Sequence, residues 1–418
     1  MSALSLRIDR PLRRLVAVAL AFALVVPSPA FAVRSASDRL SGVAAGAARV
    51  RTLPDLEAPS GILMTTDGRE LWSRDPDAPR AMASITKVMT AIVTLERMRD
   101  RMDEPVTISA DAVAMEDSGA RWKVGQRVTV RQLLEAAVVH SANGAAFQLA
   151  QKIGGTETGF VKLMNAKAEA LDLEDTLYVN SHGLDDPGHH STARDIATLS
   201  RYAMANPVYR RLAGLQQVTV PGPDGPQVLK STNLLLGNYS GAEGVKTGWT
   251  GDAGYCLSAA AKRGHVELLA VVLGTKSEEQ RFLQTRRLLD WGFKHYRDRQ
   301  VSSESTIAAL PVADYLDATV PVLVGGARRQ PVFDLDGAVQ RRITLDPSVA
   351  APVRAGQRVG TVTVYQGDRM LAQLPAVAAW DVQRPRFFSR VGIAIARMWR
   401  SVFGGETMAQ ARIVTEGE

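Results

Sequence analysis

Three short motifs bring a serine, a lysine and further polar residues into a fixed order along the chain. They are Ser84-Ile-Thr-Lys87, Ser141-Ala-Asn143 and Lys246-Thr-Gly248. A lysine that has lost its proton can activate a serine hydroxyl as a nucleophile, and water then releases the acylated serine. Each motif taken alone occurs by chance. Together they predict nucleophilic attack on an amide that lies next to a free carboxylate.

The first motif lies at the start of a helix predicted over residues 84–97. Its apolar residues form a dense surface: Ile85, Val88, Met89, Ile92, Val93 and Leu95. A separation of three residues places Ser84 and Lys87 on one helical face, so their side chains can touch. Burial and a second cation, for which Lys246 is the candidate, favour the neutral amine. The alternative is a capping serine followed by a solvated lysine.

The second motif lies in a predicted break between two helices. Residues 131–139 have the pattern of a buried helix, and a helical pattern resumes at Ala145. A loop between helices can present a hydroxyl and an amide to a cleft. We expect Ser141 to relay a proton to the leaving amine and Asn143 to bind a substrate amide carbonyl. The alternative is that both residues are ordinary helix caps.

The third motif lies on a predicted strand. Three antiparallel strands are expected in succession over residues 243–249, 253–261 and 266–274. An edge strand here can pair with a peptide substrate, and Gly248 lets the substrate backbone approach closely. We expect Lys246 and Thr247 to meet the peptide carboxylate. The backbone N–H groups of Trp249 and Ser84 are the candidate oxyanion hole.

These motifs and their flanking residues resemble the D-alanyl-D-alanine carboxypeptidases, the low-molecular-mass penicillin-binding proteins of serine peptidase family S11. The resemblance runs from about residue 55 to about residue 295 and is carried by residues 83–90, 182–184, 191–195, 244–250, 253–257 and 288–293. It implies an α+β penicillin-recognising fold of the β-lactamase and DD-peptidase kind. It also implies that Arg281 helps to bind the terminal carboxylate of the substrate.

The resemblance further implies removal of the terminal D-alanine from peptidoglycan stem pentapeptides (D-Ala-D-Ala) through an acyl-serine, with β-lactam antibiotics as inhibitors and no metal or organic cofactor. D-alanyl endopeptidase action is a close variation. A β-lactamase-like hydrolase is a rival, but it needs a Glu-x-x-Leu-Asn segment, and in the nearest segment here, Glu174 to Asn180, the asparagine is displaced. The rival of another class is a catalytically idle cell-wall scaffold, which is expected to have lost Ser84 or a lysine.

The first 32 residues have the pattern of a cleaved signal peptide. Four arginines precede an apolar run from Leu15 to Val26, and Ala30-Phe-Ala32 offers a cleavage site. The run is shorter than the ~20 residues that span a bilayer. We expect an exported, periplasmic or otherwise extracytoplasmic protein with a linker over residues 33–54; an uncleaved anchor is the alternative.

One further domain is expected after the first one, which we place at residues 55–298. Its opening hairpin around Asp67-Gly68 is expected to pair with the closing strands. The polar stretch from Asp298 to Ser305 is the expected boundary. Residues 306–382 are expected to form a small β-sandwich, with strands at 320–324, 342–345, 358–365 and 370–374.

Residues 386–403 are predicted to form an amphipathic helix. Helical projection gathers Phe388, Val391, Ile395, Met398, Trp399 and Val402 on one arc. The arginines at 386, 390, 397 and 400 gather on the opposite face, where Ile393 is out of place. This pattern is typical of a helix that lies on an anionic surface, here the outer face of the inner membrane. The alternative is a helix docked on the β domain.

The composition of the chain excludes several other kinds of protein and site. Lys and Arg number 50 against 43 Asp and Glu, which gives a net charge of +7. No basic stripe alternates with aromatic residues, so nucleic-acid binding is not expected. The single cysteine, Cys256, excludes an internal disulfide and is expected to be buried. His182, His189 and His190 lie close together, but in a loop without the spacing of a zinc site, so no metal is expected.

Overall fold

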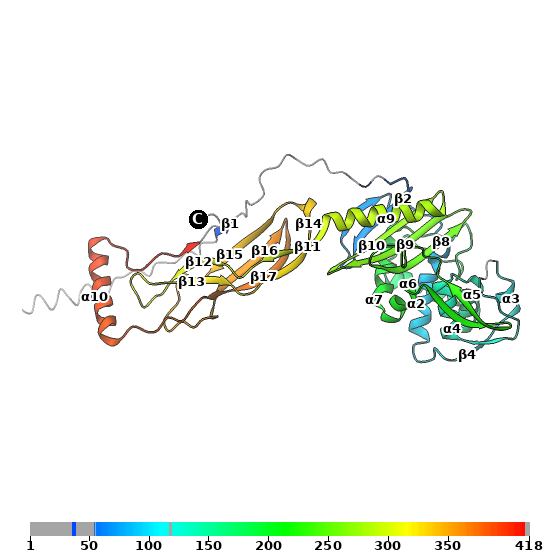
Figure 1. Ribbon diagram of the computed structural model, residues 1–418, viewed down its shortest axis with the longest axis horizontal. Coiled ribbons are helices and arrows are strands. Elements are labelled where there is room, and N and C mark those ends of the chain that lie inside the picture. Colours follow the sequence, from blue (N-terminus) through cyan, green and yellow to red (C-terminus); the bar gives the residue numbers. More distant parts are fainter. Residues whose placement is uncertain (1–35, 39–53, 55, 117–118, 414–418) are drawn as a thin grey trace, which may run out of the picture.

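The computed structural model describes residues 36–38, 54, 56–116 and 119–413. The predicted signal peptide and most of the predicted linker lie outside these residues. The molecule is elongated, with a mixed α/β domain at one end, a β domain in the middle and a single helix at the other end (Figure 1).

The first domain is built on a five-stranded antiparallel sheet in the order β3-β2-β10-β9-β8. The strands are β2 (Ser60–Thr65), β3 (Glu70–Arg74), β8 (Ala242–Thr250), β9 (Gly254–Arg263) and β10 (Val266–Thr275). The predicted opening hairpin and the three predicted closing strands are therefore confirmed, and β2 pairs with β10 as expected. β8 is an edge strand, which leaves one of its sides available to a peptide.

Helices cover both faces of this sheet. Along β10, Leu269 and Val271 face one apolar core while Leu268 and Val272 face the other, because successive side chains of a strand point to opposite faces. The second core is closed by α9 (Glu278–His295). The first core is closed by α2 (Lys87–Arg97), α4 (Val130–Val139), α5 (Asn143–Gly154), α6 (Glu157–Ala170), α7 (Ala193–Ala205) and α8 (Pro207–Ala213). Burial on both sides explains the unbroken apolar run of this strand.

Shorter elements complete the first domain. They are the 3₁₀ turn η1 (Ala83–Thr86), α3 (Ala110–Ala114), the pair β4 (Pro105–Thr107) and β5 (Arg127–Thr129), and the hairpin of β6 (Gln217–Gly222) and β7 (Gly225–Lys230). Cys256 is fully buried, as predicted. The helix predicted over residues 84–97 is confirmed, except that its first turn is η1. The helix expected to resume at Ala145 begins two residues earlier, at Asn143.

The β domain contains two sheets that pack on each other. The larger has the order β1-β15-β16-β17-β13-β12-β18, and the smaller pairs β11 with β14. The strands are β1 (Ala36–Asp38), β11 (Tyr296–Ser302), β12 (Thr306–Pro311), β13 (Thr319–Val324), β14 (Arg328–Phe333), β15 (Val339–Leu345), β16 (Arg358–Gln366), β17 (Arg369–Ala378) and β18 (Arg412–Ile413). Val301 and Val332 of the small sheet pack against Val364 and Leu371 of the large one. The four predicted strands are confirmed.

Most of the stretch expected to be the domain boundary, Asp298 to Ser305, belongs to a strand. β11 begins at Tyr296, directly after α9, and pairs with β14. Arg297, Arg299 and Gln300 of this strand are exposed, whereas Tyr296, Val301 and Ser302 are buried. β1 likewise places a short strand inside the predicted linker, against β15. The change from the first domain to the second therefore falls at the end of α9.

Side chains from both domains meet at their junction. Arg69, in the turn between β2 and β3, pairs with Asp336, and Arg369 Nη2 lies 3.2 Å from Asp67 Oδ2. Trp291 of α9 packs edge-on against Phe333 of β14, with ring centroids 5.9 Å apart. Apolar and ionic contacts thus connect the two domains beyond the covalent link.

The chain's last long element is α10 (Phe387–Phe403), which lies across the far end of the β domain (Figure 1). The predicted helix is confirmed, and the structure buries none of its residues. Within the part of the chain that the structure describes, no helix is long and apolar enough to cross a bilayer.

Candidate active site

Ser84 lies in η1, the single turn that leads into α2. This turn is held close to the segment after α6, where Gly183 adopts a φ of +91°. A Cβ atom at Gly183 would lie 2.1 Å from the carbonyl oxygen of Ala83, so only glycine fits there. Ala83 itself has a φ of +49°, a conformation that side chains other than glycine rarely adopt. The serine is therefore presented by a tightly packed backbone.

Lys87 is fully buried beneath the serine. Its Nζ lies 2.7 Å from Ser84 Oγ, within range for direct proton transfer. It also donates hydrogen bonds of 2.6 Å to Asn143 Oδ1 and to the backbone carbonyl of His182. Three oxygen atoms of neutral groups thus fix the direction of the amine. The predicted contact between Ser84 and Lys87 is present.

The second motif forms the short connection between α4 and α5. Ser141 has a φ of +68°, which breaks the helical path, and Asn143 begins α5. The amide of Asn143 accepts from Lys87 and donates to the carbonyl of Glu116 at 2.7 Å. Asn143 therefore orients the lysine, a contact that the sequence argument did not foresee. Ser141 lines the same pocket as Ser84.

The third motif runs along β8 beside the serine. A Cβ atom at Gly248 would lie 2.8 Å from the carbonyl oxygen of Met82 and 3.2 Å from the backbone nitrogen of Ser84. The absence of a side chain at Gly248 lets β8 pass this close to the N–H of Ser84. Thr247 Oγ1 lies 2.6 Å from Thr232 Oγ1, a partner that no sequence motif indicated.

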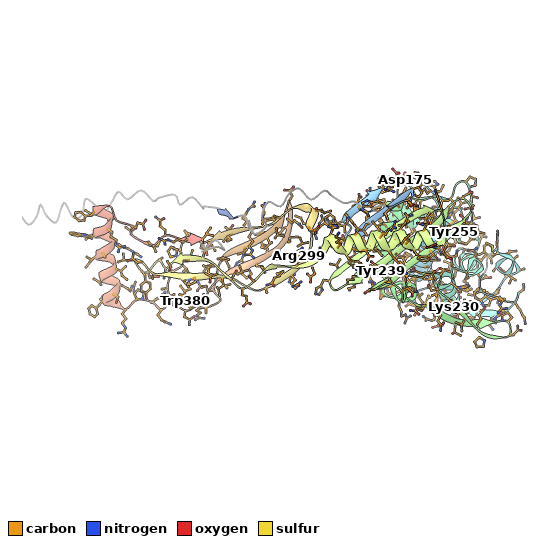
Figure 2. All side chains as sticks on the ribbon, turned by 45° about the horizontal axis from the view of Figure 1, so that its top comes forward. Asp175, Lys230, Tyr239, Tyr255, Arg299 and Trp380 are labelled. Atoms are coloured by element: carbon orange, nitrogen blue, oxygen red, sulfur yellow. The ribbon has the colours of Figure 1, made fainter. Side chains whose placement is uncertain are left out.

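Two buried basic side chains, Lys246 and Arg281, lie in or beside the third motif. Lys246 donates to the carbonyl of Thr247 at 3.0 Å, and burial, with a smaller effect of the Arg281 charge, lowers the pKa of Lys246 to about 7. Arg281 is 4% exposed and donates from Nη1 to the carbonyl of Gly248 at 3.1 Å. Burial lowers its pKa as well. Its guanidinium lies over Tyr255, which Figure 2 shows at the end of α9 that carries Arg281.

A pocket of about 460 Å³ joins these groups. Of the nine residues predicted for the site, seven line it: Ser84, Ser141, Asn143, Thr247, Gly248, Trp249 and Arg281. Lys87 and Lys246 are buried and contact lining residues through the bonds described above. Trp249 is 53% exposed at the rim. All nine predicted site residues therefore line this pocket or contact residues that line it.

The clustered histidines have structural contacts. His189 Nδ1 accepts from the N–H of Val179, and its Nε2 lies 2.7 Å from Thr86 Oγ1. His182 Nδ1 accepts from the N–H of Leu184. Burial lowers the pKa of His182 to about 3 and that of His189 to about 4, so both are neutral at pH 7. Among the residues described, no three histidine, cysteine or carboxylate side chains are placed to hold a metal ion.

Comparisons with known proteins agree with this geometry. The sequence model of the D-alanyl-D-alanine carboxypeptidase family matches residues 47–277, and that of the penicillin-binding protein 5 C-terminal domain matches residues 336–384. The chain is 30% identical to D-alanyl-D-alanine carboxypeptidase DacF of Bacillus subtilis, over 80% of this chain and 88% of that protein. It is 33% identical to DacD of Escherichia coli, over 81% and 90%. The crystal structure of Escherichia coli penicillin binding protein 6B is similar, with a TM-score of 0.59 and 30% identity over 78% of this chain and 96% of that one.

Proposed function

The chain belongs to the D-alanyl-D-alanine carboxypeptidase family (serine peptidase family S11), and from this premise we propose that it removes the terminal D-alanine from peptidoglycan stem pentapeptides. The observation that carries the proposal is the 2.7 Å contact between Ser84 Oγ and Lys87 Nζ in a pocket that Ser141, Thr247 and Arg281 also line. β-Lactam antibiotics acylate the same serine, because their strained amide also lies next to a carboxylate.

The acylation step uses groups that the pocket already holds in place. Neutral Lys87 takes the proton of Ser84 as its Oγ attacks the carbonyl of the penultimate D-alanine. The backbone N–H groups of Ser84 and Trp249 stabilise the oxyanion. The close approach of β8 to the nitrogen of Ser84 at Gly248 supports this assignment. Ser141 passes the proton on to the nitrogen of the departing D-alanine, and water then hydrolyses the acyl-enzyme.

Substrate binding follows from the edge position of β8. The stem peptide pairs with this strand, as an added strand would. Its terminal carboxylate meets Lys246, Thr247 and Arg281, which lie together along β8 and the start of α9. Asn143 contributes an N–H to a substrate carbonyl, in addition to the one that it donates to Glu116.

The test is covalent labelling by a fluorescent penicillin of protein that lacks residues 1–32, beside the Ser84→Ala variant. We expect an adduct in the wild type that persists for hours and no adduct in the variant. Rapid loss of the adduct with turnover of the drug would indicate a β-lactamase instead. If the folded wild type forms no adduct at all, the result would favour the alternative of a catalytically idle cell-wall scaffold.

We further propose that the protein is exported and rests on the outer face of the inner membrane through α10. Seven apolar side chains of this helix are 58% exposed or more: Phe387, Phe388, Ile395, Met398, Trp399, Val402 and Phe403. On the opposite face, Arg397 donates to the carbonyls of Ala313 and Tyr315, and Arg400 Nη1 lies 2.9 Å from Asp317 Oδ1. The apolar face therefore points away from the β domain.

This arrangement changes one detail of the expected membrane helix. Arg397 and Arg400 bind the β domain, while Arg386 and Arg390 remain exposed. Ile393, which the helical projection placed among the arginines, is half-buried because that face turns toward the protein. A chain cut after Asp381 should no longer sediment with vesicles that contain anionic phospholipid. Binding that survives the cut would refute the proposal, and a mature N-terminus near Val33 would support export.

A further inference from the structure

The first turn of α9 places an acidic residue beside the arginine of the pocket. Glu278 Oε1 lies 2.6 Å from Arg281 Nη2, and both residues line the pocket. Among the described residues that line it, Glu278 is the one aspartate or glutamate and Arg281 the one lysine or arginine. The Glu278 side chain is 57% exposed, whereas that of Arg281 is 5% exposed. The carboxylate therefore lies on the solvent side of the guanidinium.

A carboxylate at this place has the chemistry of the group that the pocket is proposed to bind. An incoming carboxylate seeks the same guanidinium N–H groups, and it meets the negative charge of Glu278 as it approaches. Arg281 does not depend on Glu278 for its position, because Nη1 also donates to the carbonyl of Gly248. The ring of Tyr255 supports the guanidinium as well, 5.4 Å from its centroid.

We propose that Glu278 is a specificity-determining residue that competes with ligand carboxylates for Arg281. It weakens the binding of small anions to the empty pocket, so that a ligand needs the further contacts of β8 to displace it. This inference rests on the proposed function, in which Arg281 binds the terminal carboxylate of the substrate. Glu278 acts on affinity and leaves the reactivity of Ser84 and Lys87 unchanged.

The chain offers a matched control for this proposal. Glu279 is exposed, lies in the same first turn of α9 and is absent from the pocket lining. Glu278→Gln and Glu279→Gln remove the same charge from the same helix terminus, and glutamine at 278 can still accept a hydrogen bond from Arg281. A difference between the two variants therefore reports the local competition and not the overall charge.

The experiment measures acylation by a fluorescent penicillin as a function of its concentration. Glu278→Gln should lower the half-saturating concentration about threefold, the size expected for a partly exposed charge pair, with an unchanged limiting rate. Glu279→Gln should match the wild type. Modification of Ser84 by a neutral sulfonyl fluoride, which has no carboxylate, should proceed at one rate in all three proteins.

Other outcomes decide against the proposal. An unchanged or raised half-saturating concentration in Glu278→Gln, with thermal unfolding as in the wild type, shows that Glu278 supports Arg281 or is neutral. An equal effect of Glu279→Gln shows a general charge effect. Failure of the wild type itself to be acylated overturns the proposed function, and this result is distinct from a difference among variants.

Discussion

In the first domain Lys87 and Lys246 are buried and donate to oxygen atoms of neutral groups, whereas in α10 Arg397 and Arg400 lie at the surface and bind the loop around Asp317. The lysines belong to the pocket that holds Ser84. The arginines fix the position of a helix. The pocket and α10 both use basic side chains, but those of the pocket are buried among neutral groups and those of α10 lie at the surface.

The difference shows that burial changes the protonation of a basic side chain, whereas a basic side chain at the surface keeps its charge and serves to position an element. A buried amine among neutral dipoles loses the hydration of its charged form, so the neutral form gains. The pKa of about 7 for Lys246 is an instance, with burial as its main cause. Beside Arg400, by contrast, the carboxyl of Asp317 has its pKa lowered by a hydrogen bond from the guanidinium. Such exposed pairs orient side chains and contribute little to stability.

Replacement of the buried lysine beside the nucleophile should have the largest effect. Lys87→Ala removes the group placed to accept the Ser84 proton, so acylation by penicillin should slow by about 10³-fold, the range of general base catalysis. Lys167→Ala is the control, since Lys167 pairs with Glu96 at the surface of the same domain, 2.7 Å apart. The measurement is the second-order rate of adduct formation. A loss of less than tenfold would contradict the assignment of the base.

The tight packing around the buried lysine predicts the next effect. Gly183→Ala forces a Cβ atom against the carbonyl of Ala83, at a φ of +91°, and should lower the unfolding free energy by about 3 kcal/mol. In α10, a Cβ atom at Gly392 meets no atom within 4 Å apart from the neighbouring backbone of its own helix. Gly392→Ala should therefore stabilise its helix slightly or change nothing. Denaturant unfolding of both variants checks this contrast, and equal destabilisation would contradict it.

Burial of Lys246 predicts a pH-dependent stability. Its pKa is about 7 in the folded protein and near its ordinary value of 10.5 in the unfolded chain. Between these values the unfolded chain binds the extra proton, so the folded state gains stability as the pH rises. The stability of the wild type relative to Lys246→Met should therefore rise, with a slope that approaches about 1.4 kcal/mol per pH unit. Unfolding curves at about pH 6, 7.5 and 9 test this, and a difference that is independent of pH would refute it.

The surface pair of α10 should give the smallest effect. Asp317→Asn removes the carboxylate partner of Arg400 but leaves the carbonyl contacts of Arg397. We expect amide hydrogen exchange in α10 to accelerate by no more than a few-fold, with the first domain unaffected. Asp368→Asn, at an exposed turn, is the control for charge. Complete loss of protection in α10 would show that this pair carries the docking of the helix by itself.

Local patterns in the sequence were sufficient for most elements. The period-2 and period-3.6 patterns located the helices and strands around the three motifs, since one face of each element is buried. The strands that were not predicted are β1, β4, β5, β6, β7, β11, β12, β14 and β18, because strands of two to seven residues contain too few residues for a distinct pattern. Most candidate site residues were proposed because their types and spacing are chemically specific, whereas Arg281 was proposed from the resemblance to the family. The carbonyl of His182 and the hydroxyl of Thr232 were not, since any residue has a carbonyl and threonine is common.

The sequence by itself determined which residues can perform acyl transfer and which segment can form an amphipathic helix, because side-chain chemistry and local spacing depend on neighbours along the chain. Only the tertiary structure decided that Asn143 orients Lys87, that Glu278 forms an ion pair with Arg281 at the pocket, and that two arginines of α10 bind the β domain. Asn143 is far from Lys87 in sequence and Arg397 is far from Tyr315, so packing of the whole chain sets these contacts. Packing of the whole chain also buries Lys246, and this burial lowers its pKa.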